Sequence, residues 1–506
     1  MRSVSKLFYT TIALTLTSFL MKTVAVWFNV YLAGLVGSVG MGIFQLIISV
    51  YAMSKTLAYG GVNLAATRLC IDDSDHARAA MRRVLLTAIL LGLGAFVLLY
   101  FGADLIATGW IKSDQAAQPL RVLAFSLPFL AAASGLYGYM TAVRKMGRYS
   151  VIQLIEQVSR IVVTVAIIAH FAPSNTKEVL TLVCVGITIS EMISFSLSVI
   201  SYLLDLRKNK LGREGRKGLW RSLLRIAVPD ALGSYLRSGL NTVEHLLIPW
   251  GIRRSGADTD LAFSQYGTVQ GMALPILLYP SSILGVVSGL LVPEIAECKL
   301  KRNLIQVHYM IRRVLQVALI FSMATMAVML LYAEKLSLVI YGSREAASFI
   351  QLLAPLIPVM YLDMTTDGML KGLDLQMSIM KINILDSMLC VLLVFFLVPI
   401  VSVEGYLITI YVAEIINFLC SFYKLGKEAG ARVGLWKNVI LPFFDACTAF
   451  VMARALPLFT EKPTLNLIFT ISVGLILYYL LLRITGSVSR EDKRWFTALL
   501  RIKDKS

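Results

Sequence analysis

The sequence predicts an all-α polytopic membrane protein with about fourteen transmembrane helices, and three observations lead to this prediction. Of the 506 residues, 57% are hydrophobic and 15% are charged, whereas soluble domains carry about 25% charged residues. The mean hydropathy is +0.74. Apolar runs such as "VLLTAILLGLGAFVLLYF" are long enough to cross a hydrocarbon layer of about 30 Å as helices, and too long for β-barrel strands of about 10 residues.

The predicted spans follow one another along the whole chain. The first apolar run lacks the small-residue cleavage pattern of a signal peptide, so we expect it to be retained as the first span. The expected spans lie near residues 7–33, 39–66, 84–103, 118–142, 150–171, 179–204, 226–251, 262–293, 314–334, 348–370, 382–400, 404–423, 438–457 and 464–482.

The distribution of basic residues predicts the orientation of these spans. The formal net charge is +18, and the basic residues gather on alternate loops, most densely in "RKNKLGREGRKGLWRSLLR". An excess of lysine and arginine marks the cytoplasmic side, so we expect both termini in the cytoplasm. We interpret the basic loops as topology signals that contact lipid headgroups, and we expect no nucleic-acid partner.

An internal repeat indicates two similar halves. At an offset of 230 residues, "RRVLLTAILL" from Arg82 aligns with "RRVLQVALIF" from Arg312. The same offset superposes a proline, a glycine and an acid: Pro128 on Pro358, Gly138 on Gly368 and Glu156 on Asp386. It carries one six-span bundle onto another with the same orientation, which is typical of a transporter with its substrate path between the halves.

The repeat divides the chain into four parts. We expect an N-terminal lobe of six spans, a basic cytoplasmic linker, a C-terminal lobe of six spans, and two additional spans with a basic cytoplasmic tail. Their predicted bounds are 1–204, 205–225, 226–423 and 424–506.

A polar stripe runs along span 1. Steps of 4, 3, 4 and 7 place its members on one helical face: Thr11, Thr15, Ser18, Lys22 and Asn29. A charge facing lipid at the bilayer centre costs about 2.5–3.5 kcal/mol, so this face should meet a neighbouring helix or a water-filled cavity. Because span 1 contains no acid, we favour a role for Lys22 in lining a substrate path.

Two further spans carry similar stripes. The stripe on span 7 consists of Asp230, Ser234, Arg237, Asn241 and Glu244. The stripe on span 2 consists of Tyr51, Lys55 and Tyr59. Two interpretations of Arg237 stay open. It either pairs with Asp230 or Glu244 in a structural role, or it lines a cavity together with Lys55.

Membrane acids form another set of candidates. Asp363 and Asp367 on span 10, together with Glu244, are candidates for binding a coupling cation, and pairing with basic residues is the alternative. Glu156 and Arg160 stand at i and i+4, so we expect a structural ion pair. We interpret Glu414 and Asn417 in span 12 as groups that bond to neighbouring helices.

Span 8 is interrupted by prolines. Pro275, Pro280 and Pro293 fall within "GMALPILLYPSSILGVVSGLLVP". A proline removes a helical hydrogen bond and bends the helix. Such a bend serves either packing or gating of a cavity.

No catalytic motif is present in the sequence. It contains no GxSxG elbow, no GxxxxGK[ST] phosphate loop and no HExxH pair. The six cysteines and four histidines have no metal-ligand spacing. We therefore expect no enzyme activity, no cofactor and no metal site, and transport driven by a gradient.

Several stretches resemble one family. "LAGLVGSVGMGIFQLIISVY" with "LAYGGVNLAATRL", and likewise "QLIEQVSRI", "NTVEHLLIPWGIRRSG" and "GMALPILLYPSSILGVVSGLLVPEIAE", are similar to segments of the stage V sporulation protein B group. This group belongs to the multidrug/oligosaccharidyl-lipid/polysaccharide (MOP) exporter superfamily, which includes the lipid II flippase. The resemblance covers essentially the whole chain.

The resemblance implies a flippase of the bacterial cell membrane that acts as a monomer. Its expected cargo is a polyprenyl-pyrophosphate-linked saccharide, a precursor of cell wall, spore cortex or surface polysaccharide. A cationic cavity formed by Lys22, Lys55 and Arg237 would receive the pyrophosphate, with Asn29 and Asn241 binding polar groups. Lys22 stands where the group usually has arginine, Asn29 stands where it often has another basic residue, and span 8 lacks the arginine of the lipid II flippase.

Two other functions remain open on the sequence. A cation-coupled multidrug exporter of the same superfamily requires membrane acids, which Asp363 and Asp367 supply. A membrane scaffold without transport activity would close its polar stripes by mutual pairing.

Overall fold

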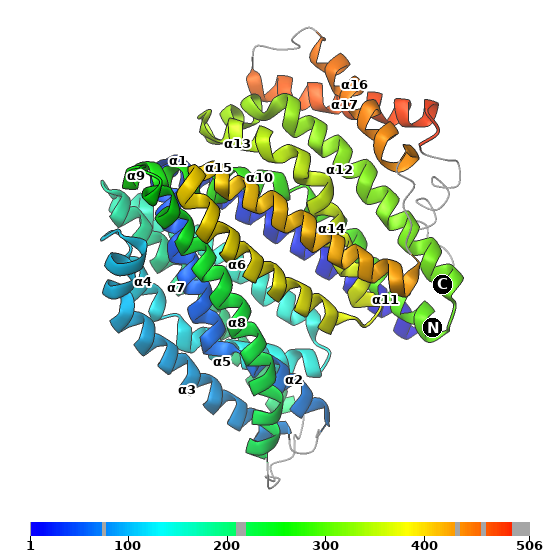
Figure 1. The fold of residues 1–506 in the computed structure, drawn as a ribbon. Helices are drawn as coiled ribbons and strands as arrows, with labels where there is room; N and C mark the ends of the chain where they lie inside the picture. The colour runs from blue at the N-terminus through cyan, green and yellow to red at the C-terminus, as the bar shows by residue number, and fades with distance from the viewer. Residues whose placement is uncertain (1, 73–76, 209–218, 431–435, 457–461, 488–506) are drawn as a thin grey trace. The chain divides into compact units, whose positions relative to one another are not determined.

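The computed structural model describes residues 2–72, 77–208, 219–430, 436–456 and 462–487. Every regular element in these residues is helical (Figure 1), which confirms the predicted all-α class. The first half comprises α1 (Arg2–Tyr59), α2 (Val62–Asp72), α3 (Ala77–Asp104), η2 (Leu105–Ile111), α4 (Ala117–Ala124), α5 (Leu127–Ala142), α6 (Met146–Phe171), α7 (Thr176–Lys208), α8 (Leu219–Arg254) and α9 (Thr259–Gly267).

The second half of the described chain also consists of helices. It comprises η3 (Thr268–Ala273), α10 (Leu274–Leu278), α11 (Ser281–Leu300), α12 (Leu304–Tyr341), α13 (Glu345–Leu353), η4 (Ala354–Leu356), α14 (Ile357–Gly372), α15 (Gln376–Ala429), η5 (Trp436–Ile440), α16 (Leu441–Arg454) and α17 (Pro463–Ile484).

The helix bounds repeat at the offset found in the sequence. Both ends of α5 and both ends of α14 are separated by 230 residues, and the first residues of α6 and α15 are separated by the same number. The repeat therefore extends to the secondary structure.

Eight helices of the described part of the chain are long and apolar enough to cross a membrane, or nine if a bent pair is one span. Part of the difference from fourteen arises because two labels each cover two helices. In α1 the helix breaks at Gly37, with φ 66°. In α15 it breaks at Val401 and Ser402. The protein is a multi-pass membrane protein, and the number fourteen stays a prediction.

The chain forms two compact units. The N-unit comprises residues 27–267 and 391–405, and the C-unit comprises residues 1–26, 268–390 and 406–506. These units differ from the lobes predicted at 1–204 and 226–423: residues 1–26 belong to the C-unit, whereas α8, α9 and residues 391–405 belong to the N-unit. The lobe division follows the sequence repeat and stays a prediction.

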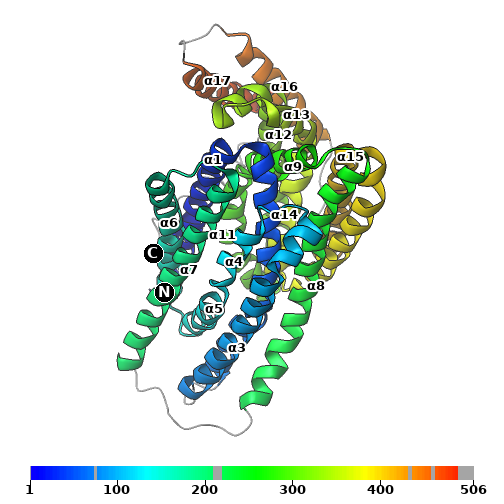
Figure 2. The same cartoon turned by 90° about the vertical axis from the view of Figure 1, so that its left-hand side faces the viewer.

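In the N-unit, α8 packs against the junction of α1 and α2 (Figure 1), and it also contacts α3 (Figure 2). Gly61 in this junction has φ 74°, and a Cβ atom there would overlap the carbonyl oxygen of Ala227. Further along α8, the Tyr235 hydroxyl donates to the Leu57 carbonyl at 3.3 Å and the Thr242 hydroxyl to the Ser49 carbonyl at 3.1 Å. These contacts fix the face that α8 presents to α1 and α2.

In the C-unit, the two last helices pack on α12 (Figure 1). The Tyr332 hydroxyl on α12 donates to the Phe450 carbonyl on α16 at 3.0 Å. The Tyr478 hydroxyl on α17 donates to the Ile320 carbonyl on α12 at 3.0 Å. The predicted span 8 is broken, since α10 ends at Leu278 and α11 begins at Ser281, on either side of Pro280.

Candidate functional site

A polar pocket of the N-unit contains much of the stripe predicted on span 7. The pocket has a volume of about 370 Å³ and lies between α8 and the junction of α1 and α2. Residues at helical steps of four, three and four line it from α8: Asp230, Ser234, Arg237 and Asn241, with Ser238 beside them. From the junction it is lined by Thr56, Tyr59, Gly60, Gly61 and Asn63.

Arg237 is exposed in this pocket. It forms no ion pair or side-chain hydrogen bond with any residue in the described part of the chain. Asp230 stands two turns away, about 10 Å along the helix axis. The arrangement does not support the interpretation in which Arg237 pairs with Asp230 or Glu244, because its guanidinium group is left available to an anion.

Lys55 lies in a different environment, within a network of charges. Its ammonium group lies 5.1 Å from the centre of the Tyr51 ring and interacts electrostatically with Glu191, Arg160 and Glu156. Lys55 does not line the polar pocket. The structure therefore places Lys55 beside acids of its own unit.

The rest of the network joins α6 to α7 and α5. Arg160 Nη2 lies 2.9 Å from Glu156 Oε1 and 3.7 Å from Glu191 Oε1. Ser194 donates to Glu156 Oε2 at 2.8 Å, and the Tyr137 and Ser194 hydroxyls are 2.5 Å apart. Two cations thus face two acids, so the network is electrically balanced. Sequence reasoning missed Glu191, although a single acid within the apolar span 179–204 was a signal.

Lys22 and Asn29 belong to different units. Lys22, in the C-unit, is exposed and has no ion pair among the described residues. The adjacent Thr23 hydroxyl is 3.1 Å from the Tyr279 hydroxyl. Asn29 is half-buried in the N-unit. The side chains of Thr11, Thr15 and Ser18 lie outside the described residues, so the predicted stripe is described in part.

An acidic cluster lies between α14 and the two arms of α15 in the C-unit. Asp363 is 9% exposed, and its Oδ2 accepts from Asn417 Nδ2 at 3.1 Å. Its Oδ1 has no hydrogen-bond partner in the described part of the chain. Asp363 also interacts electrostatically with three further acids: Glu414, Asp367 and Asp386.

The surroundings of two predicted residues, Asn417 and Glu244, can be compared with the roles that the sequence indicates. Asn417 bonds across helices to Asp363, as expected of a group that bonds to a neighbouring helix. Glu244, the third predicted coupling residue, lies on α8 in the N-unit, where it interacts with Tyr266, and its part in coupling stays a prediction. Among the residues that the structure describes, no group of three or more histidines, cysteines or acids could hold a metal ion.

Comparison with known proteins settles the family. The model of the family described as polysaccharide biosynthesis protein matches residues 7–299, more than half of the chain. The chain belongs to this polysaccharide biosynthesis family. The family match includes all five residues predicted to bind the headgroup: Lys22, Asn29, Lys55, Arg237 and Asn241.

Two curated relatives are sporulation proteins of Bacillus subtilis strain 168. "Stage V sporulation protein B" is 22% identical over 481 residues, which cover 92% of this chain and 93% of the relative. "Sporulation protein YkvU" is 21% identical over 355 residues, covering 68% and 77%.

Solved structures show the same fold as this member of the polysaccharide biosynthesis family. The lipid II flippase MurJ in an inward closed conformation matches with a TM-score of 0.73 and 14% identity, over 97% of this chain and 100% of that one. An inward-facing multidrug resistance MATE family transporter of the MOP superfamily matches with a TM-score of 0.61 and 14% identity, over 84% and 98%. The chain therefore has the MOP fold that the sequence predicts.

Proposed function

We propose that this protein is an alternating-access flippase for polyprenyl-pyrophosphate-linked saccharides, which are precursors of cell wall, spore cortex or surface polysaccharide. It acts as a monomer in the bacterial plasma membrane, with both termini in the cytoplasm, and it is not an enzyme. The observation that carries the proposal is Arg237 in the polar pocket, which forms no ion pair with any residue that the structure describes. The family, the sporulation relatives and the likeness to a lipid II flippase support this assignment.

The chemistry of the pocket suits a phosphorylated headgroup. A guanidinium group offers a planar fork of donors that matches phosphate oxygens, and charge-assisted bonds of this kind are strong. Ser234 and Asn241 on the same face of α8 supply groups that bind hydroxyls and amides of a saccharide. Lys22 and Asn29 would act on the cargo as a further cation and a further polar group.

Lys55 has a narrower role in this proposal than the sequence suggested. Because Lys55 shares its surroundings with Glu191, Glu156 and Arg160, its charge is offset within the unit. Since the network has no net charge to attract an anion, we assign Lys55 to the stability of the N-unit and headgroup binding to Arg237.

We assign ion coupling to the acidic cluster of the C-unit. Burying several carboxylates together is costly unless a proton or a cation neutralises part of their charge. Because no three of these acids are grouped closely enough to hold a metal ion, we assign proton binding to Asp363, whose Oδ1 accepts no hydrogen bond from the described residues, together with Asp367.

The decisive experiment measures translocation. Proteoliposomes receive a fluorescent polyprenyl-pyrophosphate saccharide, and quenching reports its movement between leaflets. We expect Arg237→Ala to lower the rate by about tenfold or more, the cost of a lost charge-assisted bond, and Arg237→Lys to fall between it and the parent. Arg254→Ala is the control, since Arg254 lies on the same helix with its guanidinium 5.2 Å from the Trp250 ring. Unchanged translocation in Arg237→Ala would reject the assignment of this pocket.

A cation-coupled multidrug exporter is the second candidate, favoured by the acidic cluster and by the likeness to the MATE transporter. It predicts efflux of a cationic dye such as ethidium by the reconstituted protein. The same proteoliposomes test it: dye efflux without saccharide translocation would replace the first proposal with the second. The unpaired Arg237 counts against both a cationic cargo and a scaffold whose polar groups are closed by pairing.

A further inference from the structure

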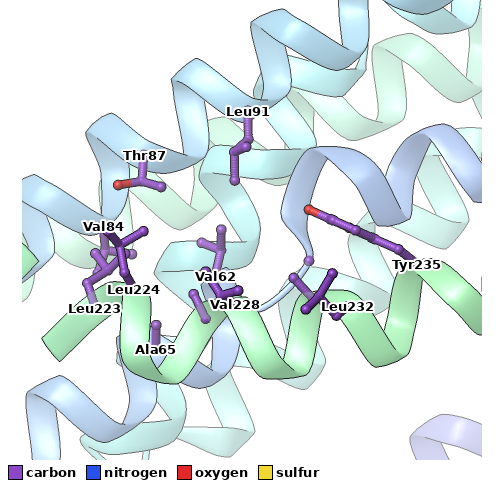
Figure 3. A pocket seen from close by; sticks show the side chains of 13 residues that line it. Val62, Ala65, Val84, Thr87, Leu91, Leu223, Leu224, Val228, Leu232 and Tyr235 are labelled. Carbon is purple, nitrogen blue, oxygen red and sulfur yellow. The ribbon is translucent and has the colours of Figure 1, made fainter. Parts of the chain in front are cut away.

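A second pocket of the N-unit adjoins the polar pocket and has the opposite character. It has a volume of about 190 Å³ and lies among α2, α3 and α8. Aliphatic side chains from the three helices surround it (Figure 3): Val62, Val84, Leu91, Leu224, Val228 and Leu232.

The two pockets meet at Gly60. This residue, in the turn between α1 and α2, lines both of them. A Cβ atom at Gly60 would overlap the Tyr235 ring, so glycine is the residue that fits here without displacing Tyr235. Ser234 and Tyr235 follow each other on α8, and the first lines the polar pocket while the second lines the apolar one. The change from polar to apolar surroundings therefore occurs within one residue of α8.

The apolar pocket is accessible from outside the unit along α8. Leu224 is 50% exposed, Val228 45% and Leu232 61%, and they stand at successive steps of four on one face of the helix. An exposed apolar face of this kind is suited to contact with the hydrocarbon of lipid chains.

The polar groups of the apolar pocket are already occupied. The Thr87 hydroxyl donates to the Arg83 carbonyl at 2.9 Å, and the Tyr235 hydroxyl donates to the Leu57 carbonyl at 3.3 Å. Neither hydroxyl is therefore free to donate a hydrogen bond to an ester carbonyl of a ligand bound in this pocket.

We infer that the apolar pocket holds the first isoprenoid units of a polyprenyl lipid whose phosphate binds at Arg237. The inference rests on the proposed function and deepens it by placing the lipid chain. In a polyprenyl phosphate the hydrocarbon is attached directly to the phosphate oxygen, which matches two pockets that share a single residue. A glycerophospholipid instead carries glycerol and ester groups between its phosphate and its chains, and the two hydroxyls of the apolar pocket, which already donate to backbone carbonyls, offer these groups no partner there.

Photo-crosslinking in nanodiscs tests the inference directly. One probe is a polyprenyl phosphate with a diazirine in the second isoprenoid unit, and the other is a phosphatidylglycerol with a diazirine in an acyl chain. We expect the first probe to label peptides that contain residues 84–91 and 223–235, and unlabelled polyprenyl phosphate to remove this labelling.

The outcomes separate the inference from the function on which it rests. Labelling of other helices by a probe that still binds in an Arg237-dependent way would overturn the inference and leave the flippase proposal standing. Labelling of the same peptides by phosphatidylglycerol, undiminished by polyprenyl phosphate, would overturn the inference in favour of a bilayer lipid. Absence of any polyprenyl phosphate binding would remove both proposals.

A substitution that fills the apolar pocket provides a second test, which measures binding of polyprenyl phosphate. Ala231 lines the apolar pocket and is 8% exposed, so Ala231→Phe places a ring where the chain would lie and leaves Arg237 in place. We expect binding of polyprenyl phosphate to weaken about tenfold, the cost of overpacking the site. Leu236→Phe, 52% exposed on the same helix outside both pockets, should bind as the parent does. If Ala231→Phe fails to fold, the crosslinking map decides; equal binding by both variants would overturn the inference.

Discussion

At the scale of single residues, the balance of charge around Glu191 is the feature most sensitive to substitution. Glu191 is 5% exposed, and it faces Arg160 and Lys55 together with Glu156. Removing the buried acid from a partly buried group of two acids and two cations leaves a positive charge without a partner, which is costly where the dielectric constant is low.

We expect Glu191→Gln to lower the free energy of unfolding by about 1–3 kcal/mol, because the amide keeps the shape of the side chain and removes its charge. The measurement is the thermal unfolding midpoint of the purified protein in detergent.

Glu297→Gln is the matched control for that measurement. Glu297 pairs with Lys301 at 2.6 Å with both side chains more than 60% exposed, and exposed pairs contribute little to stability. A midpoint for Glu191→Gln that equals that of the parent, or a shift as large in Glu297→Gln, would contradict the role given to the network.

Some of this network follows from the sequence and some does not. The pair of Glu156 and Arg160 is local, because residues four apart on a helix lie on the same face. The contact of Arg160 with Glu191 joins α6 to α7, and helical spacing says nothing about which faces of two helices meet. For the same reason the sequence could identify Lys55 as a membrane cation without showing that acids surround it.

At the scale of elements, the approach of α8 to the junction of α1 and α2 depends on Gly61. Its φ of 74° lies in the left-handed region, and its missing side chain lets the backbone of α8 come close at Ala227. Both properties are available to glycine and are expensive for other residues.

We expect Gly61→Ala to lower the free energy of unfolding by about 1–2 kcal/mol or more, from the left-handed conformation alone, and to lower translocation because α8 and Arg237 shift. Gly34→Ala is the control: a Cβ atom there meets nothing within 4 Å, and alanine favours a helix over glycine. Unfolding midpoints and translocation rates of both variants provide the check, and a Gly61→Ala variant as stable as the parent would rule out the close approach.

The positions where helices break were partly predictable. The sequence separates spans 1 and 2 between residues 33 and 39, and the break at Gly37 falls there. It separates spans 11 and 12 between 400 and 404, and the break at Val401 and Ser402 falls there. Pro280 marks the interruption of span 8. By contrast, the close approach of α8 to Gly61 depends on tertiary packing that no local pattern encodes.

At the scale of the whole molecule, the acidic cluster of the C-unit would couple translocation of the cargo to an ion gradient. We expect Asp363→Asn to abolish the dependence of translocation on a proton or sodium gradient, because the amide retains the shape of the side chain and does not bind a cation by charge.

Proteoliposomes with imposed pH or sodium gradients provide the measurement for this variant. Asp374→Asn is the control, since Asp374 is exposed in the turn after α14 and is not among the described groups that act electrostatically on Asp363 or Glu414. If Asp363→Asn translocates with the gradient dependence of the parent, the coupling assignment is wrong.

The class of fold and the family were predictable, whereas the packing units were not. Long apolar runs and the internal repeat at an offset of 230 residues can be read directly from the sequence. They predict the membrane spans and a duplicated helical bundle. Assignment of α8 to the N-unit depends on side chains such as Tyr235 and Thr242 that bond to backbone atoms of α1. The internal repeat of the sequence gives no indication of these hydrogen bonds between α8 and α1.

The contacts of α8 with α1 and α2 have a consequence for biogenesis. With Asp230, Arg237 and Glu244 along its length, α8 is not among the helices apolar enough to be candidate spans, and central charges oppose insertion of a helix by itself. During synthesis, α1 and α2 emerge from the ribosome before α8 does, and they carry the carbonyls and the glycine against which α8 packs. We therefore expect α8 to insert into the membrane cooperatively, with the helices that are already inserted supplying the contacts that hydrocarbon does not supply to its charged residues.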